Sequence, residues 1–177
     1  MMISICIANQ QQAGLIADLS RQTFYETFAS MNTKENMDKF MKESFSKEAL
    51  MNEVGVPGSI FLLAYIGEEP VGYARLRENN NPPELGNVRA LEIARIYSLT
   101  KYIGRGVGSA LMQACIDIAK NKNLDTLWLG VFQENHRAIE FYTRWGFEKF
   151  GTHVFMLGED PQQDWLMKKI LVPAIGP

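Results

Sequence analysis

The spacing of hydrophobic residues changes along the chain and predicts alternating strands and helices. Residues 3–8 alternate loosely, as in a short strand, and residues 11–28 carry apolar side chains at helical spacing. Further helical patterns begin at Thr33 and Ser46. The capping-box order at Thr33 is imperfect, because Glu35 falls one place early. We therefore expect one strand followed by helices.

The middle of the chain has the period of strands. Residues 60–66 and 71–77 flank the turn sequence Gly-Glu-Glu-Pro, which predicts an antiparallel hairpin. Residues 79–83 cannot continue a strand, and residues 88–99 form a third extended run rich in Val, Ile, Leu and Tyr. This region is expected to be a meander of at least three strands.

A strand, helix, strand crossover follows the meander. After Gly104 the period becomes helical, and residues 125–132 form another apolar strand, which implies parallel pairing with the strand before the helix. A last helix over residues 135–145 is expected to end at Gly146. Residues 147–157 alternate again, and a further strand is expected beyond a turn in the tail.

Length and composition fit one soluble globular domain over residues 1–177. The chain is 46% apolar and 21% charged, which argues against disorder. With 18 basic and 20 acidic side chains the formal charge is only -2, and the basic residues are dispersed. Neither nucleic acid nor an anionic membrane is therefore expected as a partner, and we expect one α/β domain without repeats.

Targeting and cysteine signals favour the cytoplasm. No segment approaches the roughly 20 apolar residues of a membrane span. The N-terminus lacks the features of a signal peptide, its first basic residue being Arg21. Cys6 and Cys115 lie in apolar surroundings without metal-site spacing, so both are expected to be buried free thiols in a reducing compartment.

The strongest local signal is the glycine-rich run at residues 104–109, between an extended run and an amphipathic helix. Glycines allow close backbone approach, and the N–H groups of a helix start favour a phosphate. A tight turn is the alternative. The dinucleotide fingerprint fails in both registers, because Ser109 and Leu111 stand where it needs glycine. A P-loop fails because Ser109, and no lysine, follows Gly108.

A second signal is the helix that begins after Asn135. Asn135 is a good N-cap, and the helix has a wide apolar face, although a plain core helix would look the same. Two helices thus begin at the carboxyl ends of strands expected to be parallel, where α/β folds place their ligands. Such a crevice fits an extended, phosphate-bearing cofactor.

Residues 102–109 and 135–147 resemble the paired motifs of the GNAT superfamily of acetyl-CoA-dependent N-acetyltransferases, and the order of elements agrees along nearly the whole chain. The resemblance implies a GNAT fold, with a mixed twisted central sheet flanked by helices. The antiparallel meander is N-terminal in that fold, and the parallel pair is splayed at the acetyl-CoA site. The loop residues whose backbone amides would hold the pyrophosphate of CoA are Ile103, Gly104, Arg105, Gly106, Val107, Gly108 and Ser109. Ile103 departs from the polar residue that is usual there.

The resemblance also implies roles for the strand before the loop and for the second helix. Ile96, Tyr97 and Ser98 match the segment that pairs with the pantetheine arm and holds the thioester carbonyl, where an N–H would stabilise developing charge. Tyr142 matches the tyrosine that can protonate the departing thiolate. Asn135 is expected to hydrogen-bond the pantetheine. Core packing and simple capping are the alternatives for these two residues.

Glu92 is the candidate general base. An alkylammonium has a pKa of about 10.4 and cannot attack a thioester until it is deprotonated. Glu92 lies 11 residues before Ile103 on the same expected strand, and some family members carry a catalytic glutamate at the matching position. A solvated strand face is the alternative for Glu92, and Arg95 could pair with a neighbouring acid in a purely structural role.

The C-terminal stretch 151–169, together with residues 23–28 and 32–36, resembles bacterial PaiA-type polyamine acetyltransferases. The prediction is transfer of acetyl from acetyl-CoA to a primary amine by direct attack in a ternary complex, with spermidine or spermine as the acceptor. The carboxylates that a polyamine needs could come from Glu26, Glu35, Asp38 and Glu92.

Several alternatives stay open at this point. Peptide or protein amines and amino sugars are rival acceptors, and a non-catalytic CoA-binding sensor would keep the cleft without turnover. His136 and His153 lie too far apart to indicate a metal site, and no metal is expected. An edge strand in the tail could pair across a two-fold axis, so the sequence is compatible with a homodimer.

Overall fold

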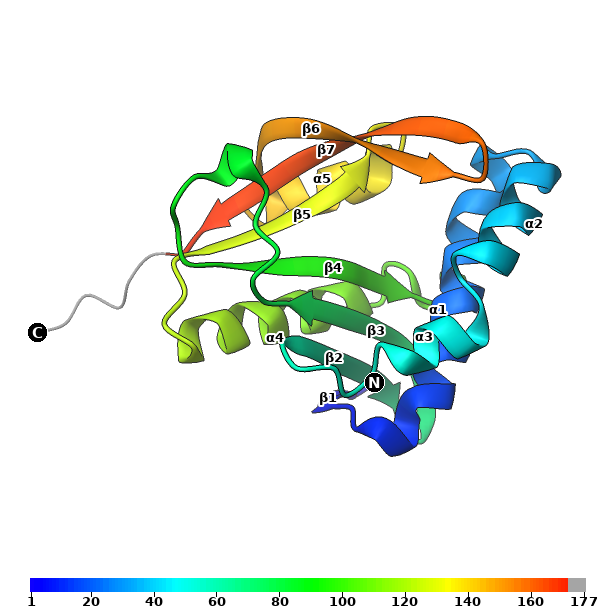
Figure 1. Ribbon diagram of the computed structural model, residues 1–177. Helices are drawn as coiled ribbons and strands as arrows, with labels where there is room; N and C mark the ends of the chain where they lie inside the picture. The colour runs from blue at the N-terminus through cyan, green and yellow to red at the C-terminus, as the bar shows by residue number, and fades with distance from the viewer. Residues whose placement is uncertain (172–177) are drawn as a thin grey trace, which may run out of the picture.

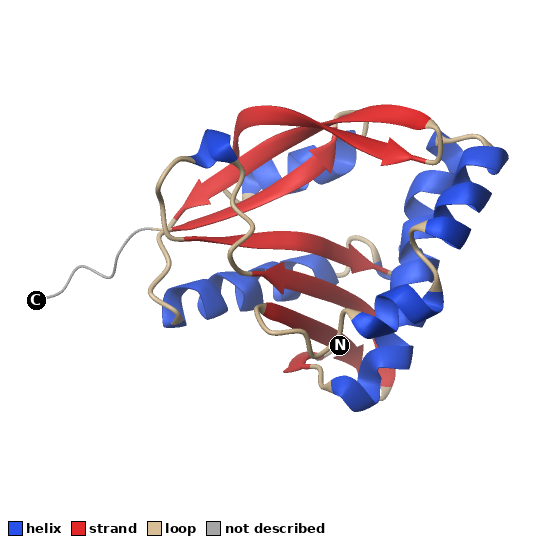
Figure 2. Cartoon of the chain, in the orientation of Figure 1, coloured by secondary structure: helices blue, strands red, loops and turns tan. Residues whose placement is uncertain are grey.

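The computed structural model describes residues 1–171, which form a seven-stranded mixed sheet flanked by helices (Figure 1). The strands are β1 (Ile3–Ile7), β2 (Ser59–Ile66), β3 (Glu69–Arg77), β4 (Ala90–Ser98), β5 (Thr126–Phe132), β6 (Glu148–Leu157) and β7 (Asp160–Ile170). The helices are α1 (Ala13–Phe28), α2 (Lys34–Glu43), α3 (Lys47–Asn52), α4 (Val107–Asn121) and α5 (His136–Arg144). The strand order is β1-β2-β3-β4-β5-β7-β6, and the predicted α/β class is confirmed (Figure 2).

Three helix starts follow from their caps as predicted. Thr33, Ser46 and Asn135 each precede a helix, and the side-chain oxygen of each accepts a hydrogen bond from the amide three residues on, at 3.2, 3.2 and 3.3 Å. These bonds satisfy amides that have no partner inside the helix. The last helix ends before Gly146, whose φ of +89° favours glycine.

The N-terminal half of the sheet is the predicted antiparallel meander of β1 to β4. Gly72 in β3 is essential to how the next helix packs on it. A Cβ at Gly72 would lie 2.7 Å from the carbonyl oxygen of Tyr97 and 3.0 Å from the side chain of Val107. The missing side chain therefore lets the first turn of α4 sit directly on the β3–β4 pair.

The chain crosses from β4 through α4 to β5, and these two strands pair in parallel as predicted. The pairing spans only Ala90 to Glu92 of β4. Immediately afterwards the β3–β4 register skips Ala94, which makes a β-bulge in β4. β4 consequently bends away from β5 while it stays paired with β3, as Figure 1 shows.

Helices cover both faces of the sheet. α4 and α5 pack on one face in a cluster that includes Leu111, Met112 and Phe147. α1 packs on the other face against β2 and β3, α3 packs on α1, and α2 closes a second cluster with Leu157 of β6. Among residues 1–171, no helix has the length and apolar character that crossing a bilayer requires.

The two cysteines differ in burial. Both are free, and Cys115 is buried in α4, where burial raises the pKa of its thiol to about 12. Cys6 is exposed, so the prediction of a buried thiol is wrong for it. β1 is an edge strand, and only the side chains of Ile3 and Ile5 turn inward to the core. Cys6 lies on the opposite face of this edge strand and stays in solvent.

A half-buried ion cluster ties α3 to the bent part of the sheet. Glu53, at the end of α3, accepts hydrogen bonds from both terminal nitrogens of Arg95 at 2.6 and 3.0 Å. Its carboxylate also lies 3.2 Å from Arg75 of β3. The side chains of Arg95 and Arg75 are only 17% and 10% exposed, so each depends on Glu53 for compensation of its charge. Arg95 therefore pairs with an acidic residue, Glu53, as the structural alternative for it expected.

Replacing Glu53 by glutamine should lower the free energy of unfolding by about 3 kcal/mol, because two largely buried guanidinium groups lose their counter-charge. Chemical denaturation at neutral pH measures this. Glu48→Gln is the matched control, since Glu48 lies exposed in the first turn of the same helix and should change stability by less than about 0.5 kcal/mol. Equal effects of the two variants would contradict the role given to the ion cluster.

Candidate cofactor and acceptor cleft

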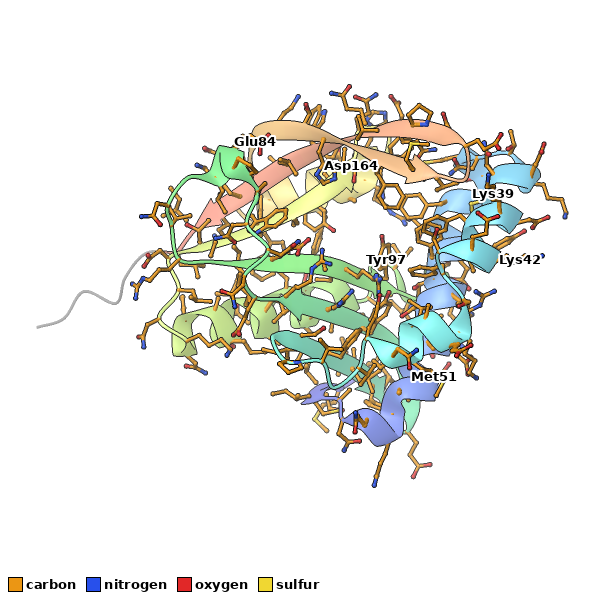
Figure 3. The ribbon with its side chains drawn as sticks, viewed as in Figure 1. Lys39, Lys42, Met51, Glu84, Tyr97 and Asp164 are labelled. Carbon is orange, nitrogen blue, oxygen red and sulfur yellow. The ribbon has the colours of Figure 1, made fainter. Side chains whose placement is uncertain are left out.

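A cavity of about 810 Å³ lies where β4 and β5 diverge. Its lining comes from both sides of the divergence: β4, the glycine-rich loop and α4 on one side, and β5, α5 and the β6–β7 hairpin on the other, with α1 and α2 closing one end. Figure 3 shows Tyr97 of β4 and Asp164 of β7 on opposite sides of this space. The volume is in the range of small-molecule sites.

The bent half of β4 presents an unpaired backbone edge to the cavity. Residues 95–98 pair with β3 on one edge only, since the parallel pairing with β5 has already ended. Leu99 donates its N–H to Val71 of β3, so the N–H of Ser98 points to the other edge, toward β5. Ile96, Tyr97 and Ser98 all line the cavity. The structure thus brings the predicted strand segment to the site with a free donor.

The glycine-rich loop lies next to this edge. Gly104 and Gly106 adopt φ values of +79° and +87°, and Gly106 is the N-cap of α4 in the left-handed region. Both glycines line the cavity with Ile103, Gly108 and Ser109. The first amides of α4 have no partner within the helix, and the helix dipole adds partial positive charge there. Loop and helix start together fit a pyrophosphate group.

The side chains of two predicted loop residues point away from the cavity. The side chain of Val107 is buried in the core beneath α4, and the guanidinium of Arg105 lies 5.8 Å from the ring centre of Tyr102. Neither lines the cavity. This agrees with a loop in which amides, and not side chains, face the ligand.

Helix α5 supplies the opposite wall. Asn135 and Tyr142, the two candidate residues from this helix, both line the cavity, and the side-chain oxygen of Asn135 also caps the helix. Burial, with a smaller contribution from Cys115, raises the pKa of Tyr142, so its hydroxyl stays protonated at neutral pH and can donate. Arg137 and Arg144 line the cavity as well and were not singled out from the sequence. Guanidinium groups there suit a phosphate-bearing ligand.

Glu92 does not line the cavity. It stands at the last position of β4 that pairs with β5, before the bulge, and its carboxylate is 9% exposed. Arg77 donates to its two oxygens at 2.7 and 2.9 Å, and Asn80 donates at 2.9 Å. The structure therefore does not bring Glu92 together with Tyr142 and the glycine loop. Its role as general base stays a prediction.

The other carboxylates expected for a polyamine groove also lie elsewhere. Glu26 accepts hydrogen bonds from the amide and hydroxyl of Thr100 at 2.9 and 2.8 Å. Asp38 pairs with Lys34 at 2.5 Å, and Glu35 lies exposed in the first turn of α2. None of them lines the cavity. The expected row of four carboxylates is thus absent from the lining that the described residues provide.

The end of the cavity away from the glycine loop is aromatic. Its aromatic lining residues are Phe24, Phe28, Phe40, Phe45, Tyr97, Phe132 and Phe155. Asp164 is the one acidic residue among the described lining residues. The turn expected in the tail lies at residues 158–159, and Asp164, which was not singled out from the sequence, lies inside β7. The alternation of Gln162, Asp164 and Leu166 on one strand face was the signal for this.

Comparison with known proteins identifies the family. The sequence profile of the Acetyltransferase (GNAT) family matches residues 21–147, which include the glycine loop and α5. The chain belongs to the GNAT acetyltransferase family. The predicted family is therefore confirmed, and the chain is an N-acetyltransferase of the GNAT type that uses acetyl-CoA. Within residues 1–171, no group of three or more His, Cys, Asp or Glu side chains is placed to hold a metal ion.

Individual relatives agree with this assignment. An uncharacterized N-acetyltransferase of Lactobacillus delbrueckii subsp. lactis is 36% identical over 154 residues, covering 87% of this chain and 89% of the relative. The spermidine N(1)-acetyltransferase of Thermoplasma acidophilum is 26% identical over 137 residues, covering 75% and 80%. The crystal structure of the PaiA N-acetyltransferase from Thermoplasma acidophilum in complex with coenzyme A has a TM-score of 0.77 at 23% identity, covering 97% of this chain and 100% of that one. That structure shows the same fold.

Replacing Gly104 by alanine should weaken CoA binding about 10-fold, measured by calorimetry. The new Cβ would strain a left-handed residue by about 1 kcal/mol and would project into the open space that the ligand needs. Gly67→Ala is the matched control, because Gly67 also has a positive φ and open surroundings but lies in the β2–β3 turn. An equal loss of CoA affinity in both variants would contradict the proposed binding of CoA by the glycine-rich loop.

Proposed function

We propose that the enzyme transfers acetyl from acetyl-CoA to a primary amine by direct attack in a ternary complex. The observation that carries this is one cavity lined at one end by the glycine loop and at the other by aromatic side chains, with the open edge of β4 between them. Donor and acceptor can therefore occupy the site together. Holding both in contact converts a bimolecular reaction into an effectively unimolecular one.

The donor end is built to hold and polarise a thioester. The amides of Gly104 to Ser109 would hold the pyrophosphate, with Arg137 and Arg144 adding positive charge from the opposite wall. The free N–H of Ser98 would donate to the thioester oxygen. Such a hydrogen bond strengthens as negative charge develops on that oxygen during attack, so it lowers the barrier.

Tyr142 is the proposed acid for the leaving thiolate. It lines the cavity beside the splayed strands, and its buried hydroxyl is neutral at physiological pH. A positioned neutral hydroxyl can hand a proton to sulfur as the carbon–sulfur bond breaks.

A polyamine such as spermidine is the acceptor that sequence likeness supports, because a spermidine acetyltransferase is among the relatives. The cavity lacks the expected row of carboxylates, but its aromatic rings offer another means of binding ammonium groups. Cation–π contacts stabilise a cation over a ring face by about 0.5–2 kcal/mol. The methylene segments of a polyamine would pack against the same rings.

Compartment and assembly form part of the proposal. Free thiols at Cys6 and Cys115 support a reducing cytoplasm. β6 is an edge strand with Val154 and Met156 exposed, which supports pairing with a second copy across a two-fold axis.

The deciding experiment is CoA thiol release from acetyl-CoA with spermidine, spermine, lysine peptides and amino sugars, followed by mass spectrometry of the products. We expect acetylated spermidine or spermine. Acetylation of peptides or amino sugars alone would reject the polyamine. Tight acetyl-CoA binding without turnover on any amine would instead identify a CoA-binding sensor, and absence of binding would reject the donor site.

Replacing Tyr142 by phenylalanine should lower kcat about 10- to 100-fold and leave acetyl-CoA affinity unchanged, because only the proton donor is removed. Steady-state kinetics with saturating amine and direct titration of CoA measure the two quantities. A parallel loss of CoA affinity would show that Tyr142 acts in packing.

A further inference from the structure

We propose that Asp164 accepts the proton of the acceptor amine and that His153, beside it, passes this proton to solvent. The proposal rests on the amine acetyltransferase function above, and it assigns the base to a residue of the C-terminal hairpin. No feature of a particular amine is required, so it holds for a polyamine or for another primary amine.

The topology places Asp164 at the reacting part of the cavity. It stands on β7 opposite Phe132 of β5, past the point where β5 has separated from β4. Figure 3 shows its side chain facing the space that Tyr97 faces from β4. A carboxylate there lies on the acceptor side of the thioester that the edge of β4 would hold.

Asp164 has room for a ligand because its neighbour is a glycine. A Cβ on Gly130 of β5 would lie 3.5 Å from Oδ2 of Asp164 and 3.4 Å from Cε1 of His153. Any larger side chain at Gly130 would crowd both groups. The lack of a side chain at this position in β5 therefore leaves Asp164 accessible from the cavity.

The polar contacts of Asp164 and Glu92 differ. Among the described residues, the close polar partner of Asp164 is Nε2 of His153, 3.4 Å from Oδ2, whereas three donor atoms of Arg77 and Asn80 bind Glu92. The carboxylate of Asp164 is 15% exposed. It thus retains lone pairs for an ammonium group, and little water competes for them.

The local electrostatics suit a base. Burial raises the pKa of Asp164, and His153 partly opposes this effect. The other titratable or charged groups lining the cavity are Arg95 and Tyr97 from β4 and Arg137, Tyr142 and Arg144 from α5; β5 contributes none, and α1 and α2 contribute phenylalanines. Arg95 is already neutralised by Glu53. A carboxylate of raised pKa holds a proton more strongly than an exposed one and is a better base.

The proton balance closes with these groups. An alkylammonium loses one proton to Asp164, and the neutral amine then attacks the thioester carbon and forms the carbon–nitrogen bond. The nitrogen loses a second proton as the carbon–sulfur bond breaks, and Tyr142 delivers a proton to the thiolate. The second proton from the nitrogen passes within the site to the Tyr142 phenolate and restores its hydroxyl group. The first proton leaves through His153, whose side chain is 44% exposed.

Asp164→Asn is the principal test, with rates measured from pH 6 to 10 on the full chain. We expect kcat at pH 7 to fall at least 100-fold with CoA affinity unchanged. The difference in kcat between this variant and the unmodified enzyme should shrink as pH rises, because the free amine becomes abundant near its own pKa of about 10.4. Asp117→Asn is the control, since Asp117 lies exposed on α4 and should leave the profile unchanged.

The sign of the stability effect separates a chemical role from a structural one. A carboxyl whose pKa is raised in the folded state favours folding when protonated at low pH and opposes it as pH rises through that pKa. Asp164→Asn should therefore unfold at the same or a higher temperature at pH 7. An inactive variant with a lower unfolding temperature and lost CoA binding would be overturning evidence, because it would mark Asp164 as structural.

His153→Gln tests the partner as a positioning residue. Without the imidazole, the pKa of Asp164 should rise further, so the acidic limb of the kcat profile should move to higher pH. Asp164→Glu keeps a carboxylate and should retain the limb with a lower kcat. An unchanged limb in His153→Gln would remove His153 from the proposal.

Two outcomes overturn the assignment while leaving the enzyme function intact. One is a dependence of kcat on pH in Asp164→Asn that equals that of the unmodified enzyme. The other is loss of the acidic limb of this dependence in Glu92→Gln while Asp164→Asn keeps it. If the proposed acetyltransferase function is itself wrong, the result differs. The unmodified chain would then acetylate no amine in the panel, and the variants would have no activity to compare.

Discussion

The early end of pairing between β4 and β5 is the constraint on which the rest of the structure depends. Parallel strands joined by a helix would normally pair along their length and fill the sheet. Here three residue pairs form, and a bulge at Ala94 then turns β4 aside while β3 keeps it in the sheet. Every ligand-facing group described above lines the wedge that this separation opens or lies at one of its ends. A polar backbone edge needs hydrogen-bond partners, and a ligand in the wedge can supply them.

Holding the wedge open requires that both sides be stiff. On the β4 side, Glu53 fixes Arg95 and Arg75 across the bent segment, and Gly72 lets α4 sit tightly on the strand pair. On the β5 side, pairing with β7 continues to the end of the strand at Phe132. The two sides of the wedge are thus stabilised by separate sets of contacts.

Much of the fold and the donor half of the site could be predicted from sequence, because they depend on local signals. Helix caps at Thr33, Ser46 and Asn135, the period change after Gly104 and the glycine run each act within a few residues. The acceptor half depended on pairing between distant segments, and there the sequence was less informative. Nothing local reveals that Arg77 binds Glu92, that β1 is an edge strand exposing Cys6, or that β7 carries Asp164 into the cavity.

The two halves of the cavity also come from different parts of the chain. The end with the glycine loop lies between β4 and α5, whereas the aromatic end combines α1 and α2 with the β6–β7 hairpin, whose tip is held on α2 by Asn36 and Lys39. The family profile ends at residue 147, one residue before β6 begins. The matched region therefore includes α2, the glycine loop and α5, and it stops short of the hairpin that carries Asp164. A hairpin outside the matched region can differ in sequence without altering the glycine loop, so one end of the cavity can be reshaped while the other keeps its form.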